Sequence, residues 1–282
     1  MLLSLAERLT RRRLNGLGIT SGQLTTAVGE LHYYQTRGQH ELPPLVILHG
    51  FGTSATSFAR VLAYLHTRVG PILAPDAPAH GFSSTRDPRP TVDLAYAGIA
   101  ELLLRRLDRP AILYGNSLGG AFAIRFALEH PERVRGLFLS SPAGAALDAQ
   151  DFATLRGVFR VGSLAHARRL VDSLTHLPAW YNPLLAPDLL WRFGRGPLRA
   201  VLESFQPAHM FTAEQLAELR APTLLQWGRS ERVLPPASLE FFRRALPAHV
   251  VFEEPDDFGH CPYMDRPREV ATRVAEYVRS LA

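Results

Sequence analysis

Short, continuous apolar runs recur along this chain, and segments with helical periodicity separate most of them. The runs occupy residues 45–48, 72–74, 111–113, 137–139, 223–225 and 250–252. Runs of this length and composition are typical of strands that are covered on both faces. Helical periodicity is clearest at residues 94–103 and 270–281, where the apolar side chains share one helix face. This alternation predicts an α/β fold with a mostly parallel, doubly wound sheet.

The alternation stops between Pro142 and Pro222, where helical segments punctuated by prolines replace the strand pattern. A long helical insertion at this place predicts a cap over the carboxyl ends of the strands, where ligands bind in such sheets. We therefore expect a core of residues 25–142 and 216–282 and a cap of residues 143–215. Most aromatic residues of the cap should form its own small core, but some should line an apolar pocket. The candidates for this lining are Phe159, Trp180, Trp191 and Phe205.

The N-terminal segment, residues 1–24, begins as a basic amphipathic stretch. Two interpretations stay open: a helix packed on the body, or one that weakly contacts an anionic membrane surface. Its apolar residues are too few for a signal peptide or a membrane span, which predicts a cytoplasmic protein. Residues 30–36 then alternate between polar and apolar side chains, which favours a strand in an antiparallel hairpin.

The charge composition argues against nucleic acid as a partner. The formal net charge is +5, and because the chain contains no lysine, all 31 basic residues are arginine. Arginine-only basicity with abundant alanine, leucine and proline is typical of a GC-rich bacterial genome. These arginines are spread along the chain and form no aromatic-flanked patch. The single cysteine, Cys261, excludes an internal disulfide framework.

One short motif points to chemistry. Residues 115–119 read G-N-S-L-G, and they lie between the strand-like residues 110–114 and the helix-like residues 120–128. A serine between two glycines at a strand-to-helix junction is held in a strained turn with its hydroxyl raised at the sheet edge. Ser117 is therefore the candidate nucleophile. The alternative is a glycine-rich turn in which Ser117 only caps the helix.

A serine nucleophile needs a base and a group that orients the base. His260 follows the last predicted strand and precedes the final helix, so it should lie at the same edge of the sheet as Ser117. Glu231 follows the preceding parallel strand, in a turn that opens a helix, and is the candidate acid. Asp256 and Asp257 are close to His260 in sequence but should point along their loop.

Three further segments carry a family resemblance. Residues 49–52 read H-G-F-G, residues 76–83 read D-A-P-A-H-G-F-S and residues 228–231 read G-R-S-E. From about residue 30 to the C-terminus the chain resembles α/β-hydrolase-fold serine hydrolases of the carboxylesterase and lipase type. It departs from their pattern at Ala79, where glycine is usual, and at Glu231, where aspartate is usual. Because some relatives carry the acid elsewhere, Asp148 and Asp151 at the entrance to the cap remain alternatives.

The resemblance implies a mechanism and its supporting residues. The backbone N–H groups of Phe51 and Leu118 would form the oxyanion hole, and His49, Asp76 and His80 would order loops around the site. The implied reaction is hydrolysis of a small-molecule carboxylic ester with a hydrophobic acyl group through an acyl-enzyme intermediate. No metal or organic cofactor is implied, and the oligomeric state is left open.

Two other functions are compatible with the same motifs. Carbon–carbon bond hydrolases of ring-cleavage dienoates also resemble this chain, but they commonly carry tryptophan where it has Cys261. A non-catalytic receptor of this fold would keep the pocket and bind a hydrophobic small molecule.

Overall fold

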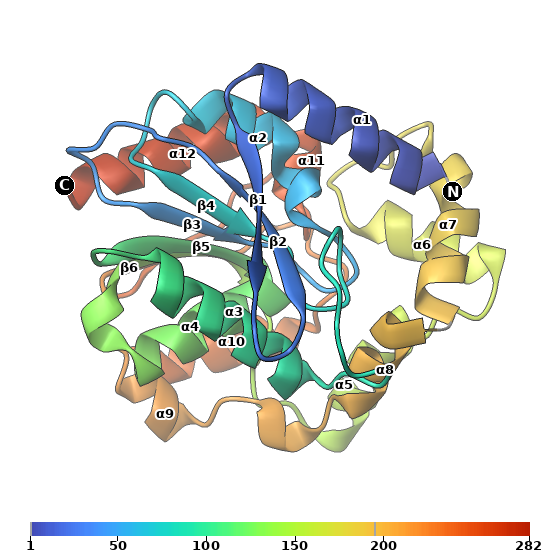
Figure 1. The fold of residues 1–282 in the computed structure, drawn as a ribbon. Helices are drawn as coiled ribbons and strands as arrows, with labels where there is room; N and C mark the ends of the chain where they lie inside the picture. Colours follow the sequence, from blue (N-terminus) through green and yellow to red (C-terminus); the bar gives the residue numbers. More distant parts are fainter. Residues whose placement is uncertain (1, 195) are drawn as a thin grey trace.

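An eight-stranded sheet forms the centre of the molecule (Figure 1). The computed structural model describes residues 2–194 and 196–282. The strand order is β1-β2-β4-β3-β5-β6-β7-β8; β1 and β2 form an antiparallel hairpin, β2 is antiparallel to β4, and all further pairs are parallel. The predicted fold class is thereby confirmed. The strands are β1 (Thr20–Thr25), β2 (Glu30–Gln35), β3 (Leu45–Leu48), β4 (Ile72–Pro75), β5 (Ala111–Ser117), β6 (Val134–Pro142), β7 (Thr223–Gln226) and β8 (Val251–Glu253).

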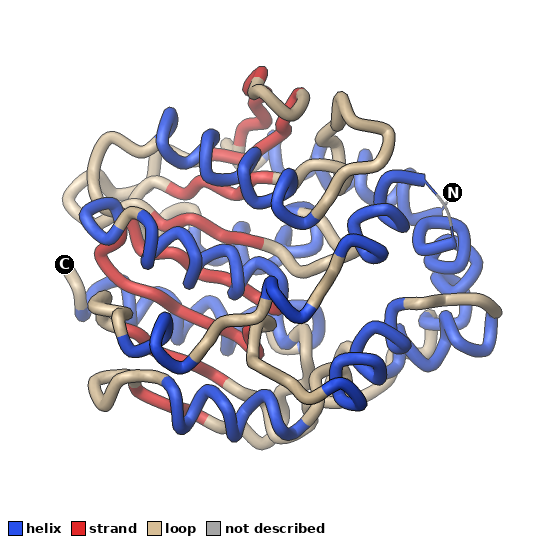
Figure 2. Tube along the Cα trace, turned by 90° about the horizontal axis from the view of Figure 1, so that it is seen from below, coloured by secondary structure: helices blue, strands red, loops and turns tan. Residues whose placement is uncertain are grey.

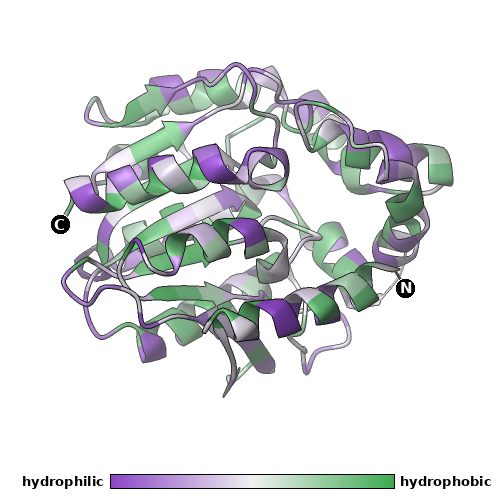
Figure 3. Cartoon of the chain, turned by 90° about the horizontal axis from the view of Figure 1, so that it is seen from above, coloured by the Kyte–Doolittle hydropathy of each residue, from purple (hydrophilic) through white to green (hydrophobic). Residues whose placement is uncertain are grey.

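Helices cover both faces of the sheet, as Figures 1 and 2 show. Successive side chains of β3 enter opposite cores: Leu45 and Ile47 pack in one, Val46 and Leu48 in the other, as the two-residue period of a strand requires. One face carries α2 (Ala59–Leu65), α11 (Pro262–Asp265) and α12 (Pro267–Ser280), and the other carries α3 (Val92–Arg106), α4 (Leu118–Glu129) and α10 (Pro236–Ala245). Apolar residues therefore concentrate in and against the strands (Figure 3).

A helical insertion joins β6 to β7. It contains α5 (Ala149–Phe159), α6 (Leu164–Ser173), α7 (Asn182–Gly194), α8 (Gly196–Ser204) and α9 (Ala213–Ala217). Helices α5 to α8 lie beyond the carboxyl ends of the strands (Figure 1). Helix α9 instead contacts α10 of the core, and it crosses the boundary expected between residues 215 and 216.

The N-terminal helix α1 (Leu2–Gly16) packs on the body of the protein. Leu14 is buried, and Glu7 forms an ion pair with Arg192 of α7 at 2.8 Å. Leu5 and Leu9 stay exposed among the arginines of this helix, so contact with an anionic membrane surface stays a prediction. Because β1 begins at Thr20, the sheet starts inside the segment 1–24 that was expected to precede the core. Met1 of that segment lies outside the described residues. Within the described chain, no helix combines the length and apolarity needed to cross a membrane.

Candidate active site

Ser117 ends β5 and immediately precedes α4, in a strained conformation. Its φ of 53° and ψ of −119° are unusual for a residue other than glycine. The flanking glycines are required by close approach. A Cβ on Gly115 would lie 2.4 Å from the carbonyl oxygen of Gly119, and one on Gly119 would lie 2.2 Å from that of Leu48. The Ser117 side chain makes no capping hydrogen bond to α4, so the structure does not support a role limited to helix capping.

The predicted acid and base are hydrogen-bonded to each other. His260 Nδ1 donates to Glu231 Oε2 at 2.8 Å, and both side chains are buried. Glu231 Oε1 accepts the backbone N–H groups of Val233 at 2.7 Å and Leu234 at 3.1 Å. Burial alone would raise the pKa of Glu231, but the charge of His260 and these hydrogen bonds outweigh it and lower the pKa. Glu231 is thus held as a carboxylate that fixes the ring of His260.

Two of the other candidate acids, Asp148 and Asp256, are engaged elsewhere. The Asp148 carboxylate accepts the backbone N–H of Asp151 at 2.8 Å and caps α5. Asp256 pairs with Arg229 at 3.0 Å on the surface. Of the candidate carboxylates, Glu231 is the one that hydrogen-bonds His260 in the part of the chain that the structure describes.

Asn116 connects the histidine loop to the serine turn. Its side-chain amide donates to the carbonyl oxygens of His260 at 2.8 Å and Ser140 at 3.0 Å. The backbone of His260 is therefore tied to the residue that precedes Ser117. Sequence reasoning missed this role. The available signal was a polar residue at the end of an otherwise apolar, buried strand.

The loop that follows β3 lies against the serine turn. A Cβ on Gly50 would approach the Cβ of Ser117 to 3.2 Å, so the backbone reaches this position without a side chain. Phe51 follows in this loop, and Leu118 is the first residue of α4, whose N-terminal N–H groups lack intrahelical partners. Phe51, Leu118 and Ser117 line the same cavity. The structure thus brings the predicted oxyanion-hole residues to the serine.

Buried histidines and Asp76 hold that loop in place. His49 Nδ1 donates to the Gly50 carbonyl at 2.8 Å, while its Nε2 accepts the N–H of Ala77 at 3.0 Å. Asp76 accepts from His32 Nδ1 at 2.9 Å and from the Ala55 N–H at 2.7 Å. Burial favours a raised pKa for Asp76, but the hydrogen bond from His32 and the nearby histidine charges lower it. His32 was not identified from the sequence, because it lies in a distant hairpin strand.

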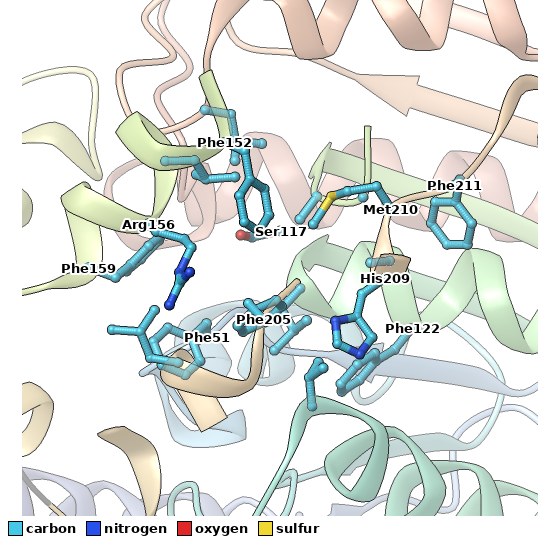
Figure 4. Close-up of a pocket in the computed structure, with 18 of the residues that line it drawn as sticks. Phe51, Ser117, Phe122, Phe152, Arg156, Phe159, Phe205, His209, Met210 and Phe211 are labelled. Atoms are coloured by element: carbon cyan, nitrogen blue, oxygen red, sulfur yellow. The ribbon is translucent and has the colours of Figure 1, made fainter. Parts of the chain in front are cut away.

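A largely apolar cavity opens at Ser117, as is typical of small-molecule sites. Phe159 and Phe205, two of the residues expected to line a pocket, lie in its wall, and their rings contact that of Phe51 at centroid distances of 5.5 and 6.0 Å. Lining residues that sequence reasoning did not select include Phe122, Phe152, Met210 and Phe211 (Figure 4).

The structure corrects the placement of two tryptophans. Trp180 is 86% exposed in the connection between α6 and α7, and it does not line this cavity. Trp191 is 60% exposed and lines a separate cavity with Glu7 and Arg8 of α1. Neither side chain lines the cavity at Ser117.

Comparisons with known proteins agree with this geometry. The family model described as "alpha/beta hydrolase fold" matches residues 43–267. A pimeloyl-[acyl-carrier protein] methyl ester esterase of Neisseria meningitidis is 26% identical over 83% of this chain and 93% of its own length. Lipase 1 of Psychrobacter immobilis is 24% identical over 94% of this chain and 86% of its own length. The crystal structure of a bacterial membrane phospholipase A superposes with a TM-score of 0.82 at 26% identity, covering 99% of this chain and 91% of that one.

The family model spans most of the chain, and distant relatives of the chain are esterases and lipases. Together with the parallel sheet, the strained serine turn and the inserted helices, this match shows that the chain belongs to the α/β-hydrolase fold family.

Proposed function

We propose that this protein is a serine hydrolase that cleaves carboxylic esters of hydrophobic acyl groups through an acyl-enzyme intermediate. The observation that carries the proposal is the buried hydrogen bond from His260 to Glu231, in a loop that Asn116 ties to the strained Ser117. A nucleophile, a base and a carboxylate that orients the base are the parts that this chemistry needs.

In the acylation half-reaction, Ser117 Oγ attacks the ester carbonyl carbon while His260 Nε2 takes the hydroxyl proton. The Glu231 carboxylate accepts a hydrogen bond from Nδ1–H of His260 and stabilises the imidazolium that forms. The carbonyl oxygen becomes negative and is stabilised by the N–H groups of Phe51 and Leu118. His260 then donates the proton it took from Ser117 to the leaving alkoxide, so the alcohol departs and an acyl-serine ester remains.

Deacylation repeats these steps with water as the nucleophile. His260 takes a proton from water as the oxygen attacks the acyl-serine carbonyl, and the same N–H groups stabilise the second oxyanion. The Ser117–acyl bond breaks, His260 returns the proton to Ser117 Oγ, and the carboxylic acid leaves. Protons and bonds balance over the cycle, which consumes one water per ester.

The acyl preference is inferred from the walls of the cavity. Phenylalanine, leucine and methionine side chains surround the opening beside Ser117, and such walls stabilise a ligand mainly by removing its apolar surface from water. Relatives named as a methyl ester esterase and a lipase support an ester as the bond that is cleaved.

The test is hydrolysis of 4-nitrophenyl esters with acyl chains of two to twelve carbons, alongside a ring-cleavage dienoate. We expect a burst of 4-nitrophenol, a preference for acyl chains longer than acetyl, and loss of turnover in Ser117→Ala. Cleavage of the dienoate with no ester turnover would instead establish carbon–carbon bond hydrolysis. If the protein binds the esters and cleaves neither substrate, it is a receptor and the proposal is wrong.

A further inference from the structure

Arg156 of α5 is an unpaired cation in the wall of the proposed acyl cavity. It lines the same cavity as Ser117, and its Nε atom is buried without a hydrogen-bond partner. Among residues 2–194 and 196–282, no hydrogen bond or ion pair engages its guanidinium. Figure 4 shows this group pointing into the space that the lining residues enclose.

The other charged groups of the cavity wall neutralise one another. Asp93 accepts from Arg125 at 2.8 Å and from His209 at 3.1 Å. Arg125 also pairs with Glu129 at 2.9 Å. With two arginines against one aspartate in the lining, the uncompensated positive charge belongs to Arg156.

Nearby protein groups do not supply the missing partner. Glu203, close enough for the charge of Arg156 to act on it, is engaged by Arg199 at 2.6 Å. The Phe152 ring lies 5.9 Å from the guanidinium carbon of Arg156, which gives a cation–π contact but accepts no directed hydrogen bond. A buried donor without an acceptor is costly, so an arginine held in this way is ready to bind an anion that enters the cavity.

We propose that Arg156 is a carboxylate-binding residue that selects esters whose acyl part carries a second, ionised carboxyl group. A single unpaired guanidinium balances one negative charge, and its fork of N–H donors matches the two oxygens of a carboxylate. The apolar walls would hold the methylene chain between the ester at Ser117 and the carboxylate at Arg156. This inference rests on the proposed esterase function and deepens it.

The experiment compares two ester series of equal acyl length. Mono-4-nitrophenyl esters of glutaric, adipic and suberic acid carry the carboxylate, and 4-nitrophenyl pentanoate, hexanoate and octanoate lack it. For the best-fitting length, Arg156→Gln should lower the ratio of kcat/KM for the charged ester to that for the neutral ester by about 10–100-fold, mainly through KM. Arg156→Lys should retain part of the preference for the charged ester, because it keeps the positive charge. The matched control is Arg160→Gln, which removes an exposed charge from the end of the same helix and should change the ratio less than about twofold.

An equal loss with both series, or an equal change in the Arg160 variant, would overturn the inference while leaving the esterase function intact. A calorimetric measurement separates the two claims if turnover is absent. Mono-4-nitrophenyl adipate should bind Ser117→Ala at least tenfold more tightly than it binds the Ser117→Ala, Arg156→Gln double variant. Equal affinities would refute the role of Arg156, whatever the outcome for catalysis.

Discussion

Replacing Glu231 by glutamine should be far more damaging than its small change in shape suggests. Glu231 Oε1 accepts two backbone N–H groups, from Val233 and Leu234, and Oε2 accepts Nδ1–H of His260. A glutamine has one carbonyl oxygen for these three donors. If that oxygen stays with the backbone, the amide NH₂ faces Nδ1, which must then accept. The ring proton moves to Nε2, and His260 cannot take a proton from Ser117.

The opposite amide orientation keeps the ring tautomer but turns NH₂ against two backbone donors, which costs about 1–3 kcal/mol for each group left unsatisfied. It also removes the charge that stabilises the imidazolium. We expect kcat to fall by about 10³–10⁴, or roughly 4–5.5 kcal/mol of transition-state stabilisation, with little change in KM.

The assay is steady-state hydrolysis of one short-chain 4-nitrophenyl ester, with circular dichroism to verify folding. Asp148→Asn keeps an N-cap residue, so it and Asp151→Asn should each cost less than about tenfold. Glu231→Asp should retain measurable activity only if the turn moves inward by about one methylene. A Glu231→Gln enzyme within tenfold of wild type, or a larger loss in either cap aspartate variant, would refute this assignment.

Three further outcomes are expected. Ser117→Ala should lower kcat by about 10⁴–10⁶ and abolish labelling by an organophosphonate, measured by intact mass; equal labelling of the variant would contradict the nucleophile. Ala79 has a φ of 68°, so Ala79→Gly should relieve strain and raise the free energy of unfolding by up to about 1 kcal/mol in urea titrations; a destabilised variant would contradict this reasoning. Burial lowers the pKa of His80 from 6.5 to about 3, so the unfolded chain binds the extra proton first as the pH falls below 6.5. The free energy of unfolding should therefore be constant with respect to His80 above pH 6.5 and decrease by roughly 1.4 kcal/mol per pH unit below it, or about 2 kcal/mol by pH 5. His80→Gln should flatten this pH dependence, measured by urea titrations at pH 7.5 and 5.

Patterns that arise within a few neighbouring residues were readable from the sequence. The first five apolar runs lie in strands and are buried, because a strand covered on both faces must be apolar at every position. The sixth run, residues 250–252, overlaps the edge strand β8, where Val251 is 54% exposed. The glycines around Ser117 mark a turn that a Cβ would obstruct, which is a local steric requirement. Glu231 and His260 could be proposed as partners because the carboxyl ends of neighbouring parallel strands meet at one edge of the sheet.

The tertiary structure decided what depends on residues far apart in the chain. Asn116 holds the carbonyl of His260, 144 residues away, and no local pattern encodes that hydrogen bond. Which cap residues line the cavity was harder still to predict, because the cap has both buried and solvent-exposed aromatic residues. Only packing of the helices placed Phe159 against Phe51 while leaving Trp180 in solvent and turning Arg156 toward the cavity. A helix period indicates which residues share a face, whereas the side toward which that face turns is set by long-range burial of apolar surface.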